Sequence, residues 1–238
     1  MLKINNLNKS YRKNKILNNI SLSVRKGEIK ALVGANGAGK STLVDIVCGV
    51  KKADNGSIVI NGVDISHPRD RQSIKFDIGY MPQIFNLYLD LTVKENLNYL
   101  RAIFNLNDKQ IVDELIKVCN LESKSNTLAK HLSGGYKQLL CLAGALINNP
   151  KFLILDEPTS AMDPVFRTIF WNIIKSYQKQ GVTVFVITHH LEELLECDSF
   201  ACLSGGDIIF DGSVQKFKSG DFINIKDIMS KFYKRKKV

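Results

Sequence analysis

Residues 34–42, with the sequence GANGAGKST, carry the clearest chemical signal in the chain. They satisfy the pattern G-x-x-x-x-G-K-[ST], in which glycines let backbone N–H groups turn inward around phosphate oxygens. An apolar strand at residues 28–33 precedes the loop, and a helix at residues 41–50 follows it and presents its positive end to the same anion. We therefore expect Lys40 to reach the β- and γ-phosphates of a nucleotide and the Ser41 hydroxyl to ligate Mg²⁺.

A glycine-rich turn between a strand and a helix also occurs in proteins that bind no ligand there. Such a turn would not require Lys-Ser at its end, so we favour a nucleotide site. The residues predicted to contact the nucleotide are Gly34, Asn36, Gly37, Ala38, Gly39, Lys40, Ser41 and Thr42.

Two carboxylates end a second apolar segment, which has the sequence FLILDE over residues 152–157. A buried strand would place Asp156 at its carboxyl end, where ligands of open α/β sheets bind. Asp156 is suited to hold Mg²⁺ through water, and Glu157 to polarise an attacking water as general base. The alternative is a pair of exposed acids followed by a proline stop. Because a phosphate loop is present, we favour the hydrolytic pair.

His189 directly follows another apolar strand, predicted over residues 182–188. A histidine in that place would contact the γ-phosphate and so sense its presence. A single histidine is more often structural or simply exposed, and His190 competes for the role on sequence grounds. We favour His189 because it comes immediately after the strand and its Thr188.

The elements that must position these groups have an α/β pattern. Short runs predict strands at residues 2–7, 20–24 and 58–60, and Asn61-Gly62 predicts a tight turn after the third of them. The runs at 152–155 and 182–187 are typical of buried parallel strands, joined by a crossover helix at 165–180 that Gly181 closes. One helical stretch is predicted over residues 93–119. The fold class is therefore α/β, with a parallel core, an N-terminal antiparallel β portion and a helical insertion.

Composition and charge limit the class of protein. The 238 residues are 45% hydrophobic with only 5 prolines, which argues against collagen-like and wholly disordered chains. The longest apolar runs are far shorter than the ~18 residues of a membrane span. The first residues contain no signal-peptide core, and none of the 5 cysteines forms a Cys-x-x-Cys pair, so we expect a reducing, cytosolic compartment.

The net charge of +10 suits nucleic acid, anionic lipid or nucleotide phosphates and does not choose among them. The scattered lysines are most simply a solvated surface. The last eight residues, KFYKRKKV, carry five basic side chains. For this tail we favour disorder without a dedicated partner over attachment to an anionic membrane.

The segment LSGGYKQ at residues 132–138 completes a set of five motifs. The others are the phosphate loop, a glutamine at position 83 after a strand, Asp156-Glu157 and Thr188-His189. In this order and spacing the chain resembles an ABC (ATP-binding cassette) ATPase subunit over residues 1–215. The resemblance implies a P-loop NTPase fold in one ATPase domain, residues 1–218, with a helical subdomain inserted at about 88–143. Residues 219–238 would form a short extension with the basic tail.

The resemblance also implies further site residues. Tyr11 would stack on adenine, and Gln83 would touch Mg²⁺ and relay the nucleotide state to the helical subdomain. Ser133, Gly134 and Gly135 would close over the γ-phosphate of ATP bound by a partner subunit, with Asp163 at the dimer contact. Two subunits would then enclose two ATP molecules, and a homodimer is the simplest case.

Three positions depart from the common pattern of the family. Leu139 and Gly144 stand where arginines are frequent, and Met162 replaces a usual Leu or Val. None of these changes removes a catalytic group. We expect the missing arginines to weaken contacts around the signature helix and to change the rate of turnover, and not the reaction.

Only one phosphate loop and one signature occur, which argues against the translation-factor class of the family, whose members usually carry two cassettes in one chain. No long heptad stretch interrupts the chain, which argues against the chromosome-maintenance class. Residues 77–97 and 163–171 are similar to cassettes of bacterial multidrug exporters. The resemblance therefore implies a transporter subunit, of export rather than import type. It would be peripheral on the cytoplasmic side of the inner membrane and would pair with a separate permease.

Two alternatives stay open. One is a soluble cassette ATPase that serves cofactor assembly or nucleic-acid maintenance. The chain has no aromatic-basic nucleic-acid motif outside the cassette, so no specific nucleic acid is expected. The other is a regulatory subunit that binds ATP without useful hydrolysis. The presence of Lys40, Asp156, Glu157 and His189 argues against that reading.

Overall fold

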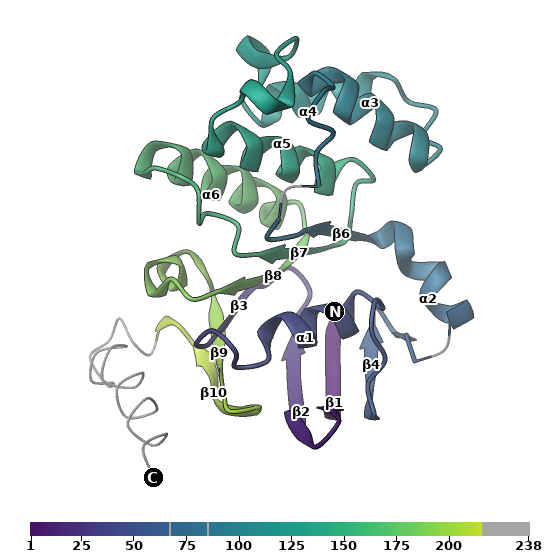
Figure 1. Cartoon of the computed structure of the whole chain (residues 1–238), viewed down its shortest axis with the longest axis vertical. Helices are drawn as coiled ribbons and strands as arrows, with labels where there is room; N and C mark the ends of the chain where they lie inside the picture. The colour runs from purple at the N-terminus through teal and green to yellow at the C-terminus, as the bar shows by residue number, and fades with distance from the viewer. Residues whose placement is uncertain (67, 85, 216–238) are drawn as a thin grey trace. The chain divides into compact units, whose positions relative to one another are not determined.

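A computed structural model describes residues 1–66, 68–84 and 86–215 (Figure 1). The predicted C-terminal extension and basic tail lie outside the described residues. The chain divides into two compact units, the first made of Met1–Arg71 and the part from Ile187 onward, the second of Gln72–Val186. The predicted boundaries of the helical subdomain do not follow this division and stay a prediction.

An antiparallel sheet forms the N-terminal part of the first unit, as predicted. Its strand order is β2-β1-β4-β5, and Leu2 pairs with Val24 at one end of the β1–β2 hairpin. The φ angles of 51° at Asn61 and 85° at Gly62 confirm the predicted tight turn between β4 and β5. The first two strands are longer than predicted, because pairing extends them to the hairpin turn. The bounds are β1 (Leu2–Tyr11), β2 (Asn14–Val24), β4 (Asn55–Ile60) and β5 (Val63–Asp64).

A parallel strand pair also lies in the first unit. Strand β3 (Ile29–Val33) is buried at all five positions and pairs in parallel with β9 (Ser199–Ser204). Strand β10 (Asp207–Ser213) returns antiparallel to β9. Neither β9 nor β10 was predicted. Helix α1 (Lys40–Val47) follows β3 and ends three residues before the predicted end.

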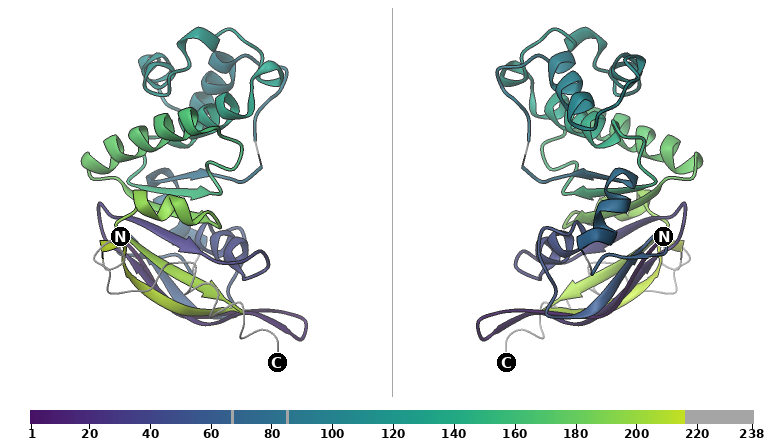
Figure 2. Two further views of the ribbon diagram at one scale, coloured as in Figure 1. Left: turned by 90° about the vertical axis from the view of Figure 1, so that its left-hand side faces the viewer. Right: turned by 90° about the vertical axis from the view of Figure 1, so that its right-hand side faces the viewer.

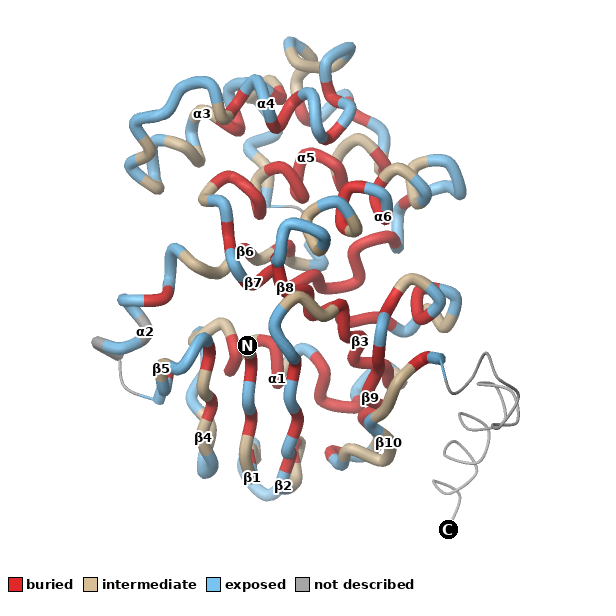
Figure 3. Tube along the Cα trace, turned by 180° about the vertical axis from the view of Figure 1, so that it is seen from behind, coloured by how far each residue is buried: buried red, intermediate tan, exposed pale blue. Residues whose placement is uncertain are grey.

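The second unit has its own parallel pair, β6 (Ile78–Met81) and β7 (Phe152–Asp156), in which Met81 lies beside Leu155. Both β7 and β8 (Thr183–Thr188) are buried along their whole length, which explains why they read as uninterrupted apolar runs (Figure 3). Helix α2 (Pro68–Ile74) and a 3₁₀ turn (Lys75–Asp77) come before β6.

The helices of the second unit correct one prediction. Residues 93–119 form two helices, because Asn105 takes a left-handed φ of 55° just after α3 and the next helix starts at Gln110. A reciprocal capping box between Thr92 and Glu95 starts α3. The crossover helix and its closure by Gly181, at φ 93°, are as predicted. The bounds are α3 (Val93–Ile103), α4 (Gln110–Val118), α5 (Gly134–Leu146) and α6 (Pro164–Lys179).

Helix α5 packs directly on β6. A side chain at Gly79 of β6 would collide with the carbonyl oxygen of Ala145, so only glycine permits this approach. Short 3₁₀ turns connect the remaining elements at Glu122–Lys124, Ala129–His131 and Leu191–Glu196. All five cysteines are thiols, and all of them except Cys48 are buried.

Candidate nucleotide-binding and hydrolysis site

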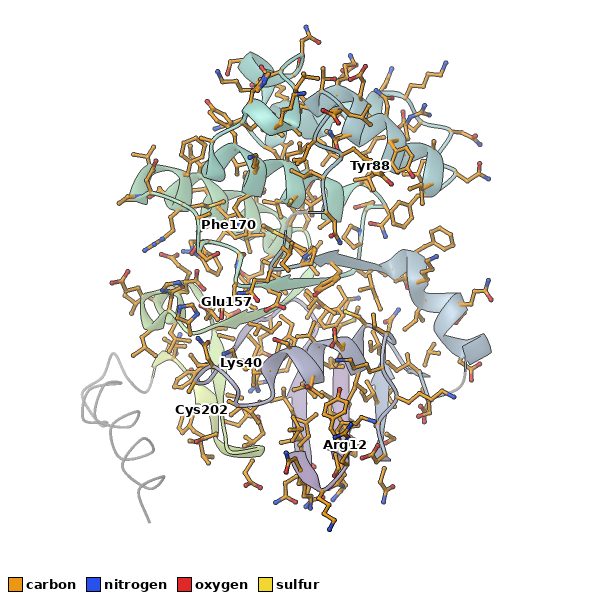
Figure 4. The ribbon with its side chains drawn as sticks, viewed as in Figure 1. Arg12, Lys40, Tyr88, Glu157, Phe170 and Cys202 are labelled. Atoms are coloured by element: carbon orange, nitrogen blue, oxygen red, sulfur yellow. The ribbon has the colours of Figure 1, made fainter. Side chains whose placement is uncertain are left out.

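The phosphate loop runs from the end of β3 to the start of α1. Its lysine is 7% exposed, and the Lys40 Nζ donates hydrogen bonds to the carbonyl oxygens of Gly34 at 2.7 Å and Ala35 at 3.3 Å. Figure 4 shows Lys40 at the beginning of α1. The ammonium group therefore lies against the inside of the loop, in the place where a phosphate-binding cation is needed.

Main chain from two distant strands packs on this loop. Gly39, the N-cap of α1, has a φ of 108°, and a Cβ there would lie 2.9 Å from the Ile16 carbonyl oxygen of β2. A Cβ on Gly34 would collide with the carbonyl oxygen of Leu203 in β9. These two glycines therefore serve close packing as well as the loop conformation. Ile16 and Leu203 were missed by sequence reasoning, since no local pattern marks either of them.

Tyr11 ends β1, where it pairs with Asn14 across the hairpin turn. Its ring is accessible, at 41% exposure, and the ammonium groups of Lys9 and Lys51 lie 5.6 and 5.5 Å from its centroid. Hydrogen bonds to Asp45, and secondly to Tyr11, raise the pKa of Lys51. Adenine stacking by Tyr11 stays a prediction.

The two histidines after β8 differ in their surroundings. His189 is exposed, whereas His190 is the N-cap of the 3₁₀ turn that follows, and its N–H donates to the Thr188 hydroxyl at 2.9 Å. The two rings lie 4.0 Å apart between centroids. The hydrogen bond fixes the main chain of His190 after β8, and the assignment of the γ-phosphate contact to His189 stays a prediction.

The carboxylates Asp156 and Glu157 are 6% and 4% exposed at the carboxyl end of β7. Glu157 has a φ of 50°, which costs free energy for a non-glycine residue and is typical of functional positions. Gln83 is exposed two residues after β6, the parallel neighbour of β7. The structure therefore brings Gln83 and the two acids to the same edge of the second unit's strand pair.

The signature residues begin α5. Ser133 is the N-cap, but its hydroxyl makes no capping hydrogen bond, and the side chain is exposed. A Cβ on Gly134 would lie 3.0 Å from the Ala161 carbonyl oxygen, and one on Gly135 would lie 2.6 Å from the Phe166 ring. The signature is thus held against the start of α6, with Tyr136 packed edge-on to Phe166 at 4.8 Å.

Asp163 has a local role that sequence reasoning did not assign. Its Oδ1 accepts hydrogen bonds from the backbone N–H groups of Val165 at 2.9 Å and Phe166 at 3.0 Å, which makes it the N-cap of α6. Because Phe166 touches Gly135, the cap also helps to position the signature. Its predicted place at a dimer contact stays a prediction.

The positions that depart from the family pattern are packed in apolar surroundings. Leu139 is fully buried, and Met162 is 6% exposed. At Gly144 a Cβ would lie 2.8 Å from the Leu100 Cδ1 of α3. Apolar packing therefore occupies the region of α5 where the family often has arginines.

We expect Gly135→Ala to destabilise the protein and to slow ATP hydrolysis. The new methyl group would overlap the base of the Phe166 ring, and such overpacking costs about 1–3 kcal/mol. Gly144→Ala is the matched control on the same helix, because it meets only the tip of a flexible leucine. Both changes gain helix propensity of up to ~1 kcal/mol. Urea unfolding and phosphate release of the two variants measure the difference, and equal values would contradict the packing argument.

The predicted site residues are distributed over both units. Tyr11, the phosphate loop and His189 belong to the first unit; Gln83, the signature, Asp156, Glu157 and Asp163 belong to the second. Within each unit the structure places them at strand ends or helix starts. No helix among the described residues is long and apolar enough to cross a membrane.

Comparisons with known proteins agree with these motifs. The chain is 37% identical to a Nod factor export ATP-binding protein I of Rhizobium etli over 87% of this chain and 66% of that protein. It is 31% identical to a ribose import ATP-binding protein, RbsA, of Caldanaerobacter subterraneus, over 94% of this chain and 47% of that protein. The chain thus spans less than two thirds of the length of either relative.

A solved structure also resembles this chain. The dimeric post-hydrolysis state of the ATP-binding cassette MJ0796, bound to ADP and Pi, matches with a TM-score of 0.82 and 28% identity, over 90% of this chain and 99% of that one. This likeness confirms the predicted P-loop α/β fold. The sequence model described as ABC transporter matches residues 17–160. The chain therefore belongs to the ABC transporter family.

Proposed function

We propose that the chain is the ATP-binding and ATP-hydrolysing subunit of an ABC transporter. In this function two subunits close around two ATP molecules and drive a separate membrane permease. The observation that carries the proposal is Lys40, buried and directed into a phosphate loop, in a chain that also has a buried carboxylate pair at the carboxyl end of β7.

The predicted magnesium ligands have suitable chemistry. Ser41, Gln83 and Asp156 offer a hydroxyl, an amide oxygen and a carboxylate, and Mg²⁺ prefers hard oxygen donors together with substrate phosphates. When bound, the ion would neutralise charge on the phosphates. Ser41 and Gln83 are exposed, so both side chains are accessible to a ligand.

Each proposed site residue has a separate role in ATP binding or hydrolysis. Glu157 accepts a proton from the attacking water, since it offers a carboxylate directly after β7, beside Asp156. Lys40 stabilises charge on the β- and γ-phosphates, and His189 contacts the γ-phosphate. Tyr11 stacks on the adenine with its accessible ring.

The signature supports the proposal of two subunits. The Ser133 hydroxyl is not used as a cap, and it stands with backbone N–H groups at the start of a 13-residue helix. Such a helix end attracts an anion. In the proposed dimer this anion is the γ-phosphate of ATP held by a second copy, and Asp163 lies at the contact between copies.

The segment after Gln83 is the proposed contact with the permease. Ile84, Tyr88 and Leu89 are 78%, 50% and 49% exposed, so these three apolar side chains are accessible to a partner. The buried Asn96 holds the Tyr88 main chain by hydrogen bonds in both directions, at 2.9 and 3.0 Å. Asn96 therefore fixes the main chain that carries the exposed Tyr88 ring.

Export is favoured over import. The export relative named above is more similar in sequence than the import relative, at 37% against 31% identity. The membrane-peripheral location on the cytoplasmic side follows from the permease partner. A soluble cassette ATPase in cofactor assembly or nucleic-acid maintenance is the alternative.

Recovery of partners from membranes tests the proposal. The Glu157→Gln protein is expressed in its native organism and extracted gently from membranes in the presence of ATP. A polytopic membrane protein is expected to co-purify with it in stoichiometric amount. Mass spectrometry identifies the partners. Recovery only from the soluble fraction, with ribosomal, DNA-bound or assembly proteins, would overturn the transporter reading and leave the ATPase chemistry untouched.

A pair of variants sharpens this experiment. Ile84→Asp in the same background should lose the membrane protein, because it puts a charge into the proposed contact. Ile103→Asp changes another exposed isoleucine, at the end of α3 and 57% exposed, and should retain the partner. Equal recovery with both variants would contradict the assignment of the segment at 84–89.

A further inference from the structure

We propose that a basic turn, formed by Arg12 and Lys13 between β1 and β2 and by Lys15 at the start of β2, steers the nucleotide's phosphates toward the phosphate loop. The inference rests on the proposed binding of ATP and adds a group of residues that speeds its capture. The turn itself makes no catalytic contact in this proposal.

The charges of the basic turn are available to a ligand. All three side chains are exposed, and among the described residues none of them forms an ion pair. No acid occurs between residues 11 and 16. Figure 2 shows the turn as the purple loop that extends beyond the neighbouring strand ends of the first unit, and Figure 4 labels Arg12 on it. Three positive charges are thus concentrated on one projecting turn.

Neighbouring lysines do not contribute in the same way. Lys9 pairs with Asp54 at 2.8 Å, and Lys51 pairs with Asp45 at 2.9 Å. Each of these ammonium groups has a carboxylate beside it, so the local charge is balanced. The charges of Lys9 and Lys51 are therefore balanced by carboxylates, whereas, among the described residues, those of the basic turn are not.

The strand residue that follows the basic turn packs against the phosphate loop. Lys15 precedes Ile16, whose carbonyl oxygen would lie 2.9 Å from a Cβ on Gly39. A Cβ on Gly206, in the turn between β9 and β10, would lie 2.7 Å from the same oxygen, and the Asn18 N–H donates to the Gly206 carbonyl at 2.7 Å. Contacts with Gly39 and Gly206 thus hold the strand residues next to the basic turn beside the N-cap of α1, where the phosphates are proposed to bind.

Charges placed in this way act on the rate of encounter. A cluster of one sign near a binding site raises the association rate of an oppositely charged ligand, by 10-fold or more in favourable cases. The effect is screened beyond a Debye length of about 10 Å at 0.1 M salt. It leaves dissociation nearly unchanged, because the charges do not belong to the bound contacts.

The test compares two triple variants of the full chain by stopped-flow, using a ribose-labelled fluorescent ATP with Mg²⁺. Replacing Arg12, Lys13 and Lys15 by glutamine should lower the association rate constant about 3- to 10-fold at ~0.01 M salt. The difference from wild type should nearly vanish at ~1 M salt, where the Debye length is about 3 Å. The dissociation rate constant should change less than about twofold.

Lys3, Arg25 and Lys26 provide the matched control. They are exposed and unpaired among the described residues, and they lie at the opposite end of the β1–β2 hairpin, where Lys3 pairs with Ser23. At about 3.3 Å per strand residue, Lys3 is roughly 30 Å from Arg12. Glutamine at these three positions removes the same net charge and should leave the association rate close to wild type.

The outcomes separate the two proposals. Equal slowing by both triple variants, or slowing that persists at high salt, would overturn the steering role. A change confined to the dissociation rate would overturn it too, since it would place the basic turn in the bound contacts. If the wild-type chain fails to bind the nucleotide at all, the proposed function fails first.

Discussion

Lys40→Ala is expected to abolish tight ATP binding, with an affinity loss of at least about 100-fold. The lysine is buried, and its Nζ points into the loop. A hydrogen bond between charged groups contributes about 1.5–3 kcal/mol, and the ammonium group is expected to contact two phosphates. Equilibrium titration with a fluorescent ATP analogue measures the loss.

Two controls accompany this variant. Thermal unfolding without nucleotide should show that the protein stays folded, since alanine also removes the hydrogen bond to the Gly34 carbonyl. Lys52→Ala changes an exposed lysine in the same unit and should bind ATP as wild type does. Wild-type affinity in the Lys40 variant would mean that the phosphates are held elsewhere.

Glu157→Gln is expected to retain ATP binding and to lose hydrolysis by about 100- to 10,000-fold, the range for removal of a general base. Glutamine keeps the size of the side chain in its buried place and removes the group that accepts the proton. With ATP and Mg²⁺ the variant should accumulate as a closed dimer, because hydrolysis is the step that opens it.

Phosphate release and light scattering after gel filtration measure these two effects. Glu122→Gln, at an exposed glutamate in the second unit, is the control and should behave as wild type. Unchanged hydrolysis in the Glu157 variant would refute its assignment as general base. Loss of hydrolysis without a stable dimer would refute the proposed opening step alone.

The parts of the fold that were predicted correctly depend on residues close in sequence. Asn61 and Gly62 take the positive φ angles of a tight turn because the side chains at those two positions allow them. Helix α6 begins at a proline after its Asp163 cap and ends before Gly181. The phosphate loop is likewise one contiguous segment, so its pattern alone indicates its conformation.

The parts that were missed depend on partners far away in the chain. Strand β9 is a short apolar segment that pairs with β3, about 170 residues earlier, so no local signal separates it from a loop. The break between α3 and α4 occurs without proline or glycine, at an asparagine that takes a left-handed conformation. Helical periodicity on both sides of Asn105 concealed that break.

The family could be predicted from the amino-acid sequence, and so could the strand or helix end at which each motif lies, because each motif is contiguous. The packing partners of these motifs are visible only in the folded chain: the carbonyl oxygens of Ile16 and Leu203 lie against the phosphate loop, and the Phe166 ring lies against the signature. These contacts join segments that are 23 or more residues apart, and a glycine's need for space is visible only when its neighbour is known. Local patterns carry chemistry and conformation, whereas close packing depends on the whole folded chain.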